Sequence, residues 1–159
     1  MRFVEAVGLA IDDINLDHSH PHLALRQYPW RPLKTATRER LVPLVGASLW
    51  AARRIVDTQS SPYAFPRYTT AHKANANHAS AALNKWLKGH APEGCVIHSF
   101  RHSMRDRLRA VQCPFDIVNQ IGGRSTVRVG QGYGSGYGLD VLYGRMGKAV
   151  GELDQSHSL

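Results

Sequence analysis

The sequence has few cysteines and no long apolar segment. Its two cysteines, Cys95 and Cys113, are too few for a disulfide framework, so we expect reduced thiols and a cytoplasmic protein. No stretch approaches the roughly 20 apolar residues of a membrane-spanning helix, and we therefore expect no membrane partner. Internal repeats and long linkers are also missing, which predicts that residues 1–159 form one domain.

Acidic residues are scarce relative to basic ones. The 12 Asp and Glu residues stand against 20 Lys and Arg residues, which leaves a net charge of +8 at pH 7. Such a charge favours a polyanionic partner, either a nucleic acid or an anionic membrane surface. Because the sequence has neither a lipidation signal nor a strongly amphipathic basic helix, a nucleic acid is the partner that we expect.

Apolar spacing predicts an α+β, mainly helical fold with a small antiparallel sheet near the N-terminus. Residues 3–9 have the spacing of a short helix. Residues 11–45 alternate between short apolar runs and polar turns, which predicts an antiparallel meander whose first strand lies at residues 11–17 and which ends at Gly46. Further helices are predicted at residues 49–56, 70–88, 98–111, 114–121 and 139–150.

The helix predicted at residues 98–111 has two distinct faces. A buried stripe is expected at helical spacing, formed by Phe100, Met104, Leu108 and Val111. His98, Arg101 and Arg105 lie on a neighbouring face, because residues three or four apart are neighbours on a helix surface. This second face combines a proton carrier with fixed cations.

Tyr133 follows in a glycine-rich run. It lies 32 residues after Arg101, and every second residue from Gly130 to Gly138 is glycine. Alternate glycines predict a mobile segment, which would deliver the tyrosine hydroxyl to the cations as a nucleophile. A hydroxyl and a cluster of cations can support phosphodiester transfer without a metal ion.

Six motifs occur in a fixed order along the chain. They are Arg2-Phe3-Val4-Glu5-Ala6, Leu33-Lys34-Thr35, Arg40-Leu41-Val42-Pro43-Leu44, His98-Ser99-Phe100-Arg101-His102, Gly122-Gly123-Arg124-Ser125-Thr126 and Tyr133. With these motifs the chain resembles the catalytic domain of the tyrosine site-specific recombinases, the phage integrase family. The resemblance implies that family's catalytic-domain fold, double-stranded DNA as the partner, DNA recombination or integration as the activity, and no metal or other cofactor.

The resemblance also implies a mechanism in which DNA strands are cleaved and rejoined through a covalent 3′-phosphotyrosine. Tyr133 would be the nucleophile, with Tyr137 as its rival in the same run. Arg2 and Arg101 would clamp the phosphate, since a guanidinium matches phosphate geometry.

The remaining motif residues would handle protons and charge. Lys34 would protonate the leaving 5′ oxygen as a general acid, and His98 would bind the phosphate or take the tyrosine proton. Arg124 stands where the family usually has His or Trp. It can donate hydrogen bonds to the phosphate, but it cannot act as a base.

Two departures from the family pattern shape our expectations. Besides Arg124, the chain begins at the first arginine of the motif set, so we expect a catalytic domain truncated at the N-terminus and lacking the core-binding domain. A second hypothesis is therefore a catalytically impaired, DNA-binding remnant of an integrase. By resemblance we also expect a homo-oligomer, a tetramer on DNA, in which the helix at residues 139–150 can be exchanged between protomers.

One further cluster allows a different interpretation. The run Asp17-His18-Ser19-His20-Pro21-His22 offers good metal ligands, so a metal-dependent hydrolase is a third hypothesis. Alternating histidines beside a proline are also typical of a polar hairpin tip. We favour the hairpin tip and predict no metal site.

Overall fold

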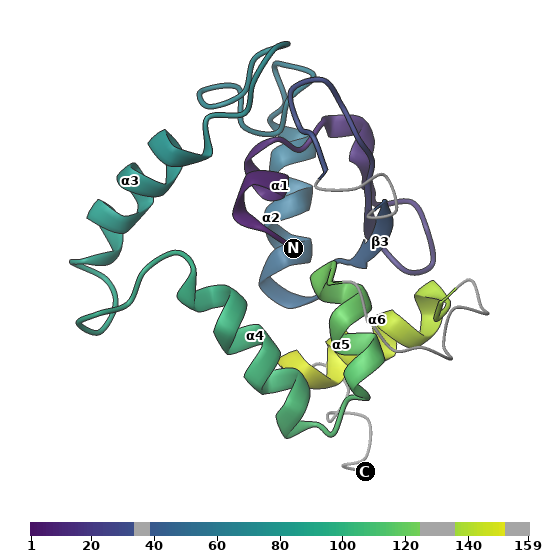
Figure 1. Ribbon diagram of the computed structural model, residues 1–159. Coiled ribbons are helices and arrows are strands. Elements are labelled where there is room, and N and C mark those ends of the chain that lie inside the picture. The colour runs from purple at the N-terminus through teal and green to yellow at the C-terminus, as the bar shows by residue number, and fades with distance from the viewer. Residues whose placement is uncertain (34–38, 125–135, 152–159) are drawn as a thin grey trace.

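The structure is a computed structural model that describes residues 1–33, 39–124 and 136–151. Its elements in chain order are α1 (Phe3–Val7), the 3-10 turn η1 (Ile11–Asp13), β1 (Ile14–Asn15), β2 (His22–Leu25), β3 (Arg40–Pro43), α2 (Gly46–Asp57), α3 (Ala76–Leu87), α4 (Ser99–Ala110), α5 (Phe115–Gly122) and α6 (Leu139–Val150). The predicted α+β, mainly helical class is confirmed for these residues (Figure 1). None of the described helices is long and apolar enough to cross a lipid bilayer.

The sheet is a three-stranded antiparallel meander with β2 in the middle, as predicted. Leu23 of β2 pairs with Ile14 of β1 on one side and with Val42 of β3 on the other. All four residues of β2 are buried, because β2 is covered by β1, β3 and a core that includes Ala52 of α2. Gly46 follows β3 and begins α2, so the predicted end of the meander is confirmed.

The first predicted strand is mostly wrong. Residues 11–13 form a 3-10 turn, and only Ile14–Asn15 pair as a strand. The cause is Asp13, whose carboxylate accepts a hydrogen bond from the Ala10 N–H at 3.0 Å and so closes a tight turn. Local side-chain bonding of this kind competes with strand pairing and is not visible in apolar spacing.

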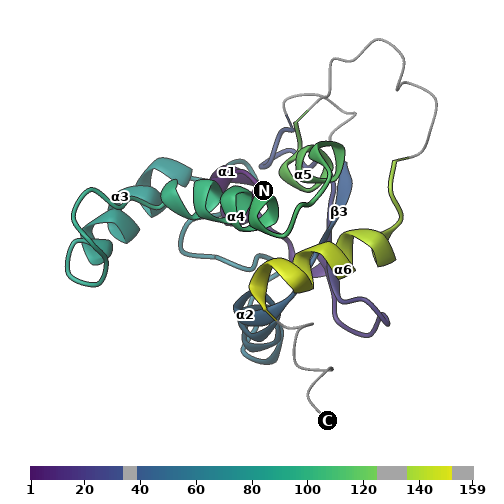
Figure 2. The same ribbon diagram turned by 90° about the horizontal axis from the view of Figure 1, so that it is seen from below.

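A second core joins α4, α5 and α6. Its buried members include Leu108, Ile117, Ile121, Leu142 and Met146. Figure 2 shows α6 crossing beneath α5 and β3, and α6 packs on both α4 and β3. Leu142 and Met146 are four residues apart and therefore share the inward face of α6. This core holds the C-terminal half of the chain against the sheet.

The long helix predicted at residues 70–88 begins late. α3 starts at Ala76, where the Asn75 side chain accepts a hydrogen bond from the His78 N–H at 3.1 Å. Before it, Thr69 and Ala74 form an isolated antiparallel bridge that keeps residues 70–73 in a turn. Alanine content is only a weak guide to helix bounds, because capping and tertiary contacts override it.

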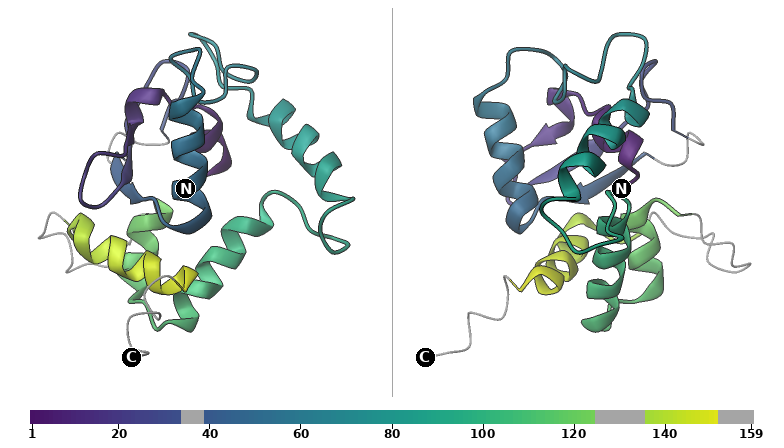
Figure 3. Two further views of the ribbon diagram at one scale, coloured as in Figure 1. Left: turned by 180° about the vertical axis from the view of Figure 1, so that it is seen from behind. Right: turned by 90° about the vertical axis from the view of Figure 1, so that its left-hand side faces the viewer.

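The buried stripe predicted on α4 is wrong at its first position. Leu108 is buried and Met104 and Val111 are partly buried, whereas Phe100 is 62% exposed. The reason is the course of α4, whose C-terminal half packs in the second core while its N-terminal end continues from the loop after α3 (Figures 1 and 3). Phe100 consequently borders a cavity rather than the core.

A buried ion pair anchors the N-terminal half and offers a test of the fold. Arg31 Nη1 lies 2.7 Å from Asp13 Oδ2, and both side chains are fully buried. We expect Arg31→Ala to lower the free energy of unfolding by about 3–5 kcal/mol, because it leaves a buried carboxylate without its cation. Urea denaturation measures this loss.

The exposed pair between Arg109 and Asp106, 3.4 Å apart, gives the matched control. Arg109→Ala should leave stability unchanged, since exposed pairs contribute little. Equal losses in the two arginine variants would contradict the assignment of Arg31 as the anchor.

Candidate active site

A cavity of about 420 Å³ lies between the start of α1, the first turns of α4 and the end of α5. Its lining includes four of the six predicted site residues, namely Arg2, His98, Arg101 and Arg124. Arg105 also lines it, as predicted from the face that it shares with His98 and Arg101. The rest of the wall is mainly apolar, and the His98 and Arg124 side chains are exposed to solvent.

Arg2 is placed by the carboxylate of Glu5. The backbone N–H of Arg2 donates a hydrogen bond to Glu5 Oε2 at 2.6 Å, and α1 begins at the next residue. A carboxylate three residues into a helix commonly returns to the backbone in this way and fixes the first turn. The helix start therefore holds the Arg2 backbone at the cavity.

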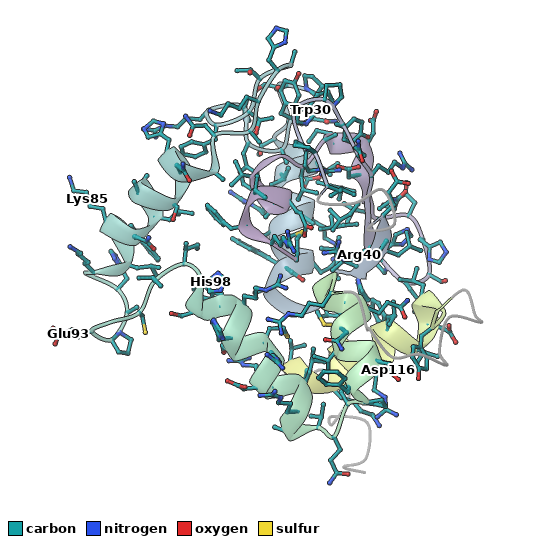
Figure 4. The ribbon with its side chains drawn as sticks, in the orientation of Figure 1. Trp30, Arg40, Lys85, Glu93, His98 and Asp116 are labelled. Atoms are coloured by element: carbon teal, nitrogen blue, oxygen red, sulfur yellow. The ribbon has the colours of Figure 1, made fainter. Side chains whose placement is uncertain are left out.

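The same carboxylate pairs with Arg40 of β3. Arg40 Nη2 lies 2.8 Å from Glu5 Oε2, and the two side chains are 7% and 4% exposed. Arg40 Nε also donates to the Ile121 carbonyl of α5 at 3.4 Å. Figure 4 shows Arg40 beside the end of α5 and His98 at the start of α4. Arg40 thus connects α1, β3 and α5 at one point.

The charge of Glu5 reflects these bonds. Burial by itself raises the pKa of a carboxyl group, but the hydrogen bonds from Arg40 and from the Arg2 N–H outweigh it and hold the pKa of Glu5 below its ordinary value. Glu5 is therefore ionised at neutral pH and supplies the negative charge that Arg40 needs.

Arg101 links α4 to α5 through one guanidinium nitrogen, and its other terminal nitrogen has no hydrogen-bond partner among the described residues. Its Nη2 donates to the Gly122 carbonyl at 2.9 Å. Its Nη1 is buried and has no hydrogen-bond partner in the described part of the chain. Burial lowers the pKa of Arg101, and repulsion from Arg124, Arg2 and Arg40 lowers it further, while Glu5 raises it. A partly buried guanidinium with one buried, unused donor is suited to an anion.

The end of α5 places Arg124 at the cavity. Gly123 caps the helix with φ of 64°, in the left-handed region that favours glycine. A side chain at Gly123 would also collide with Arg40, since its Cβ would lie 2.6 Å from Nη1 and Nη2. Arg124 follows directly, and its N–H donates to the Asn119 carbonyl at 2.9 Å. The predicted helix end at Gly122 and Gly123 is confirmed.

Residues 1–135 match the protein-family model described as the phage integrase family. The chain belongs to the phage integrase family. Membership places it among the proteins of site-specific DNA recombination, with DNA as its partner. Neither the curated proteins nor the solved structures gave a match.

Two of the predicted site residues lie outside the described residues. Lys34 falls in the range 34–38 and Tyr133 in the range 125–135. Tyr137, the rival nucleophile, is described and does not line the cavity. Its backbone is held on α5 by the Gln120 side chain, which donates to the Tyr137 carbonyl and accepts from the Tyr137 N–H, each at 2.9 Å.

Arg40 was not among the site residues predicted from the sequence. Arg40 was interpreted only as part of a strand. The sequence feature that points to Arg40 is its position just before the apolar run Leu41-Val42-Pro43. A cation in a strand beside the core is costly to bury unless it has a partner. Pairing it with Glu5 requires tertiary structure, because the two lie 35 residues apart in the chain.

The histidine cluster forms no metal site in the described residues. The His18 and His22 rings pack edge to face with centroids 5.0 Å apart, and His20 packs on Tyr143 of α6. No group of three or more His, Cys, Asp or Glu residues is arranged to hold a metal ion within the described ranges. The cluster lies at the turn between β1 and β2, as the hairpin interpretation predicted.

The Glu5–Arg40 pair predicts a pH-dependent stability. Because the folded-state pKa of Glu5 is below the ordinary value of 4.5, its contribution is present above that pH and is lost as the pH falls through the folded-state pKa. Glu5→Gln should therefore cost about 3 kcal/mol at pH 7, since it leaves Arg40 buried without a counter-charge. The difference from the wild type should shrink below pH 4.5.

Urea denaturation at pH 7 and pH 3.5 measures both values. The exposed Glu93 provides the control, and Glu93→Gln should match the wild type at both pH values. A Glu5→Gln loss that is the same at the two pH values would contradict an ionised Glu5 in the folded state.

Proposed function

We propose that this chain cleaves and rejoins DNA strands by site-specific recombination through a covalent 3′-phosphotyrosine. The observation that carries the proposal is the convergence of Arg2, His98, Arg101 and Arg124 on one cavity. A phosphodiester in that cavity would meet several cations at once, including the unused Nη1 of Arg101. Prearranged donors of this kind stabilise the negative charge that gathers on the non-bridging oxygens in the transition state.

The proposed step transfers the DNA phosphoryl group to tyrosine, and the energy of the broken phosphodiester bond is kept in the phosphotyrosine bond. The Tyr133 hydroxyl attacks the phosphorus, a bond forms between the tyrosine oxygen and phosphorus, and the bond to the 5′ oxygen breaks. His98 accepts the tyrosine proton or binds the phosphate, and Lys34 protonates the leaving 5′ oxygen. A 5′-hydroxyl from the same or a partner strand then reverses the step, so that no nucleotide cofactor is needed.

Tyr133 is preferred over Tyr137 as the nucleophile. Tyr133 lies nine residues beyond Arg124, a length that spans at most about 30 Å when fully extended, so it is within reach of the cavity. Tyr137 is tied by its backbone to Gln120, and the cavity lining does not include it. Both facts support Tyr133.

A suicide substrate tests the reaction. A nicked duplex that carries the recognition site loses a short 5′-hydroxyl fragment after cleavage, which traps the covalent adduct. We expect an adduct with the wild type and with Tyr137→Phe, and none with Tyr133→Phe. Arg101→Ala should slow adduct formation about 100-fold or more, because one transition-state donor is lost. Denaturing gels measure the adduct.

Each other outcome has a definite meaning. An adduct that survives Tyr133→Phe moves the nucleophile to Tyr137. Salt-sensitive DNA binding without an adduct, both in the 159-residue chain and in a chain extended upstream of Met1, would instead identify a DNA-binding remnant without chemistry.

We further propose that the chain acts as a homo-oligomer on DNA and exchanges α6 between protomers. In the structure the apolar face of α6, with Leu142 and Met146, is buried against its own chain. Exchange would place the same face in an identical core of the neighbour, so it costs little packing energy. Light scattering with and without DNA should show a larger species only on DNA, and a strict monomer on cognate DNA would contradict exchange.

A further inference from the structure

The start of α4 is held by a side chain from α3. Asn84 Oδ1 accepts a hydrogen bond from the Ile97 N–H at 2.7 Å, and Asn84 Nδ2 donates to Ser80 Oγ at 3.3 Å. Asn84 is half-buried, and it connects Ser80 within α3 to Ile97 in the turn that precedes α4. The first bond is short and ties the turn before α4 to the last two turns of α3.

This turn carries a predicted site residue. Ile97 and His98 are adjacent, both line the cavity, and His98 immediately precedes the first residue of α4. The other bonds of the turn are local, since the Ser99 hydroxyl accepts from the Val96 N–H and the Ser99 N–H donates to the Val96 carbonyl. These local bonds shape the turn without fixing its place relative to the rest of the molecule.

The start of α4 has a second tether, since Arg101 Nη2 donates to the Gly122 carbonyl of α5 at 2.9 Å. α3 and α4 diverge from the loop that joins them (Figures 1 and 3), and Figure 4 shows Lys85 and Glu93 at the outer edge while His98 lies further inward. Within the described residues the His98 side chain forms no hydrogen bond and only packs edge to face on His102, with centroids 4.9 Å apart. The place of the His98 ring therefore depends on its backbone, which the Asn84 bond ties to α3 and the Arg101–Gly122 bond, one helical turn further on, ties to α5.

We propose that Asn84 is a positioning residue for the cleavage reaction, acting through the Ile97 N–H to hold His98 at the cavity. The role rests on the proposed function and adds to it a residue from α3, outside the six motifs. A displacement of about 1 Å at a reacting group can cost about 100-fold in rate. Loss of the Asn84 bond should accordingly slow cleavage at least about tenfold while DNA affinity is unchanged.

Three variants separate this role from general destabilisation. Asn84→Ala removes the acceptor for Ile97 and should slow adduct formation on saturating suicide substrate. Asn84→Asp keeps an oxygen at that position and should restore most of the rate. Ser80→Ala removes only the partner of Asn84 Nδ2 and should match the wild type. The dissociation constant for the same duplex should be equal in all four proteins.

A double-mutant cycle with His98→Ala gives the decisive comparison. If Asn84 acts through His98, then Asn84→Ala should slow the wild type about tenfold and should have no further effect in the His98→Ala background. Equal slowing in both backgrounds, or a wild-type rate in Asn84→Ala, overturns the role. An absent adduct in the wild type itself would contradict the proposed function, and would be distinguished by the failure of every variant alike.

Discussion

The buried ion pair between Glu5 and Arg40 is the interaction on which the arrangement of the site depends. One carboxylate oxygen accepts from the Arg2 N–H and from Arg40, and the Arg40 guanidinium reaches the Ile121 carbonyl. Two buried charges are costly unless their polar atoms are satisfied, and here each has more than one partner. The relative place of α1, β3 and α5 is therefore set by directional bonds, which tolerate less displacement than apolar packing does. The Arg40 guanidinium also occupies the space that leaves Gly123 no room for a side chain.

A second consequence concerns charge. Several cations meet at the cavity and repel one another. Burial lowers the pKa of Arg101, and repulsion from Arg124, Arg2 and Arg40 lowers it further. Glu5 is the nearby charge that opposes this effect. A bound phosphodiester would relieve the repulsion and would satisfy the buried Nη1 of Arg101. The mutual repulsion of these cations thus favours the proposed anionic ligand, and it relates the net positive charge of the chain to its proposed function.

Much of the fold and of the candidate site could be predicted from the sequence, and the wrong or missing predictions have physical causes. The helices α2, α5 and α6, the antiparallel meander and the helix end at Gly122 follow from apolar spacing and glycine position. The late start of α3 and the turn at Asp13 depend on side-chain hydrogen bonds that spacing does not record. Arg2, His98, Arg101 and Arg124 were identified as a set only through the family resemblance, and the structure brings them to one cavity. Arg40 and Asn84 were missed because their roles depend on partners that are distant in sequence.

The central claim is that four side chains from three separate segments of the chain present one phosphate-binding site. A crystal structure of the protein with tungstate, a phosphate analogue located by its anomalous scattering, tests it most directly. The account predicts a single tungstate in the cavity, with an oxygen about 2.7–3.2 Å from Arg101 Nη1 and further contacts from Arg2, His98 and Arg124. A cavity that stays empty while tungstate binds elsewhere, or these four side chains directed away from one another, would contradict the account.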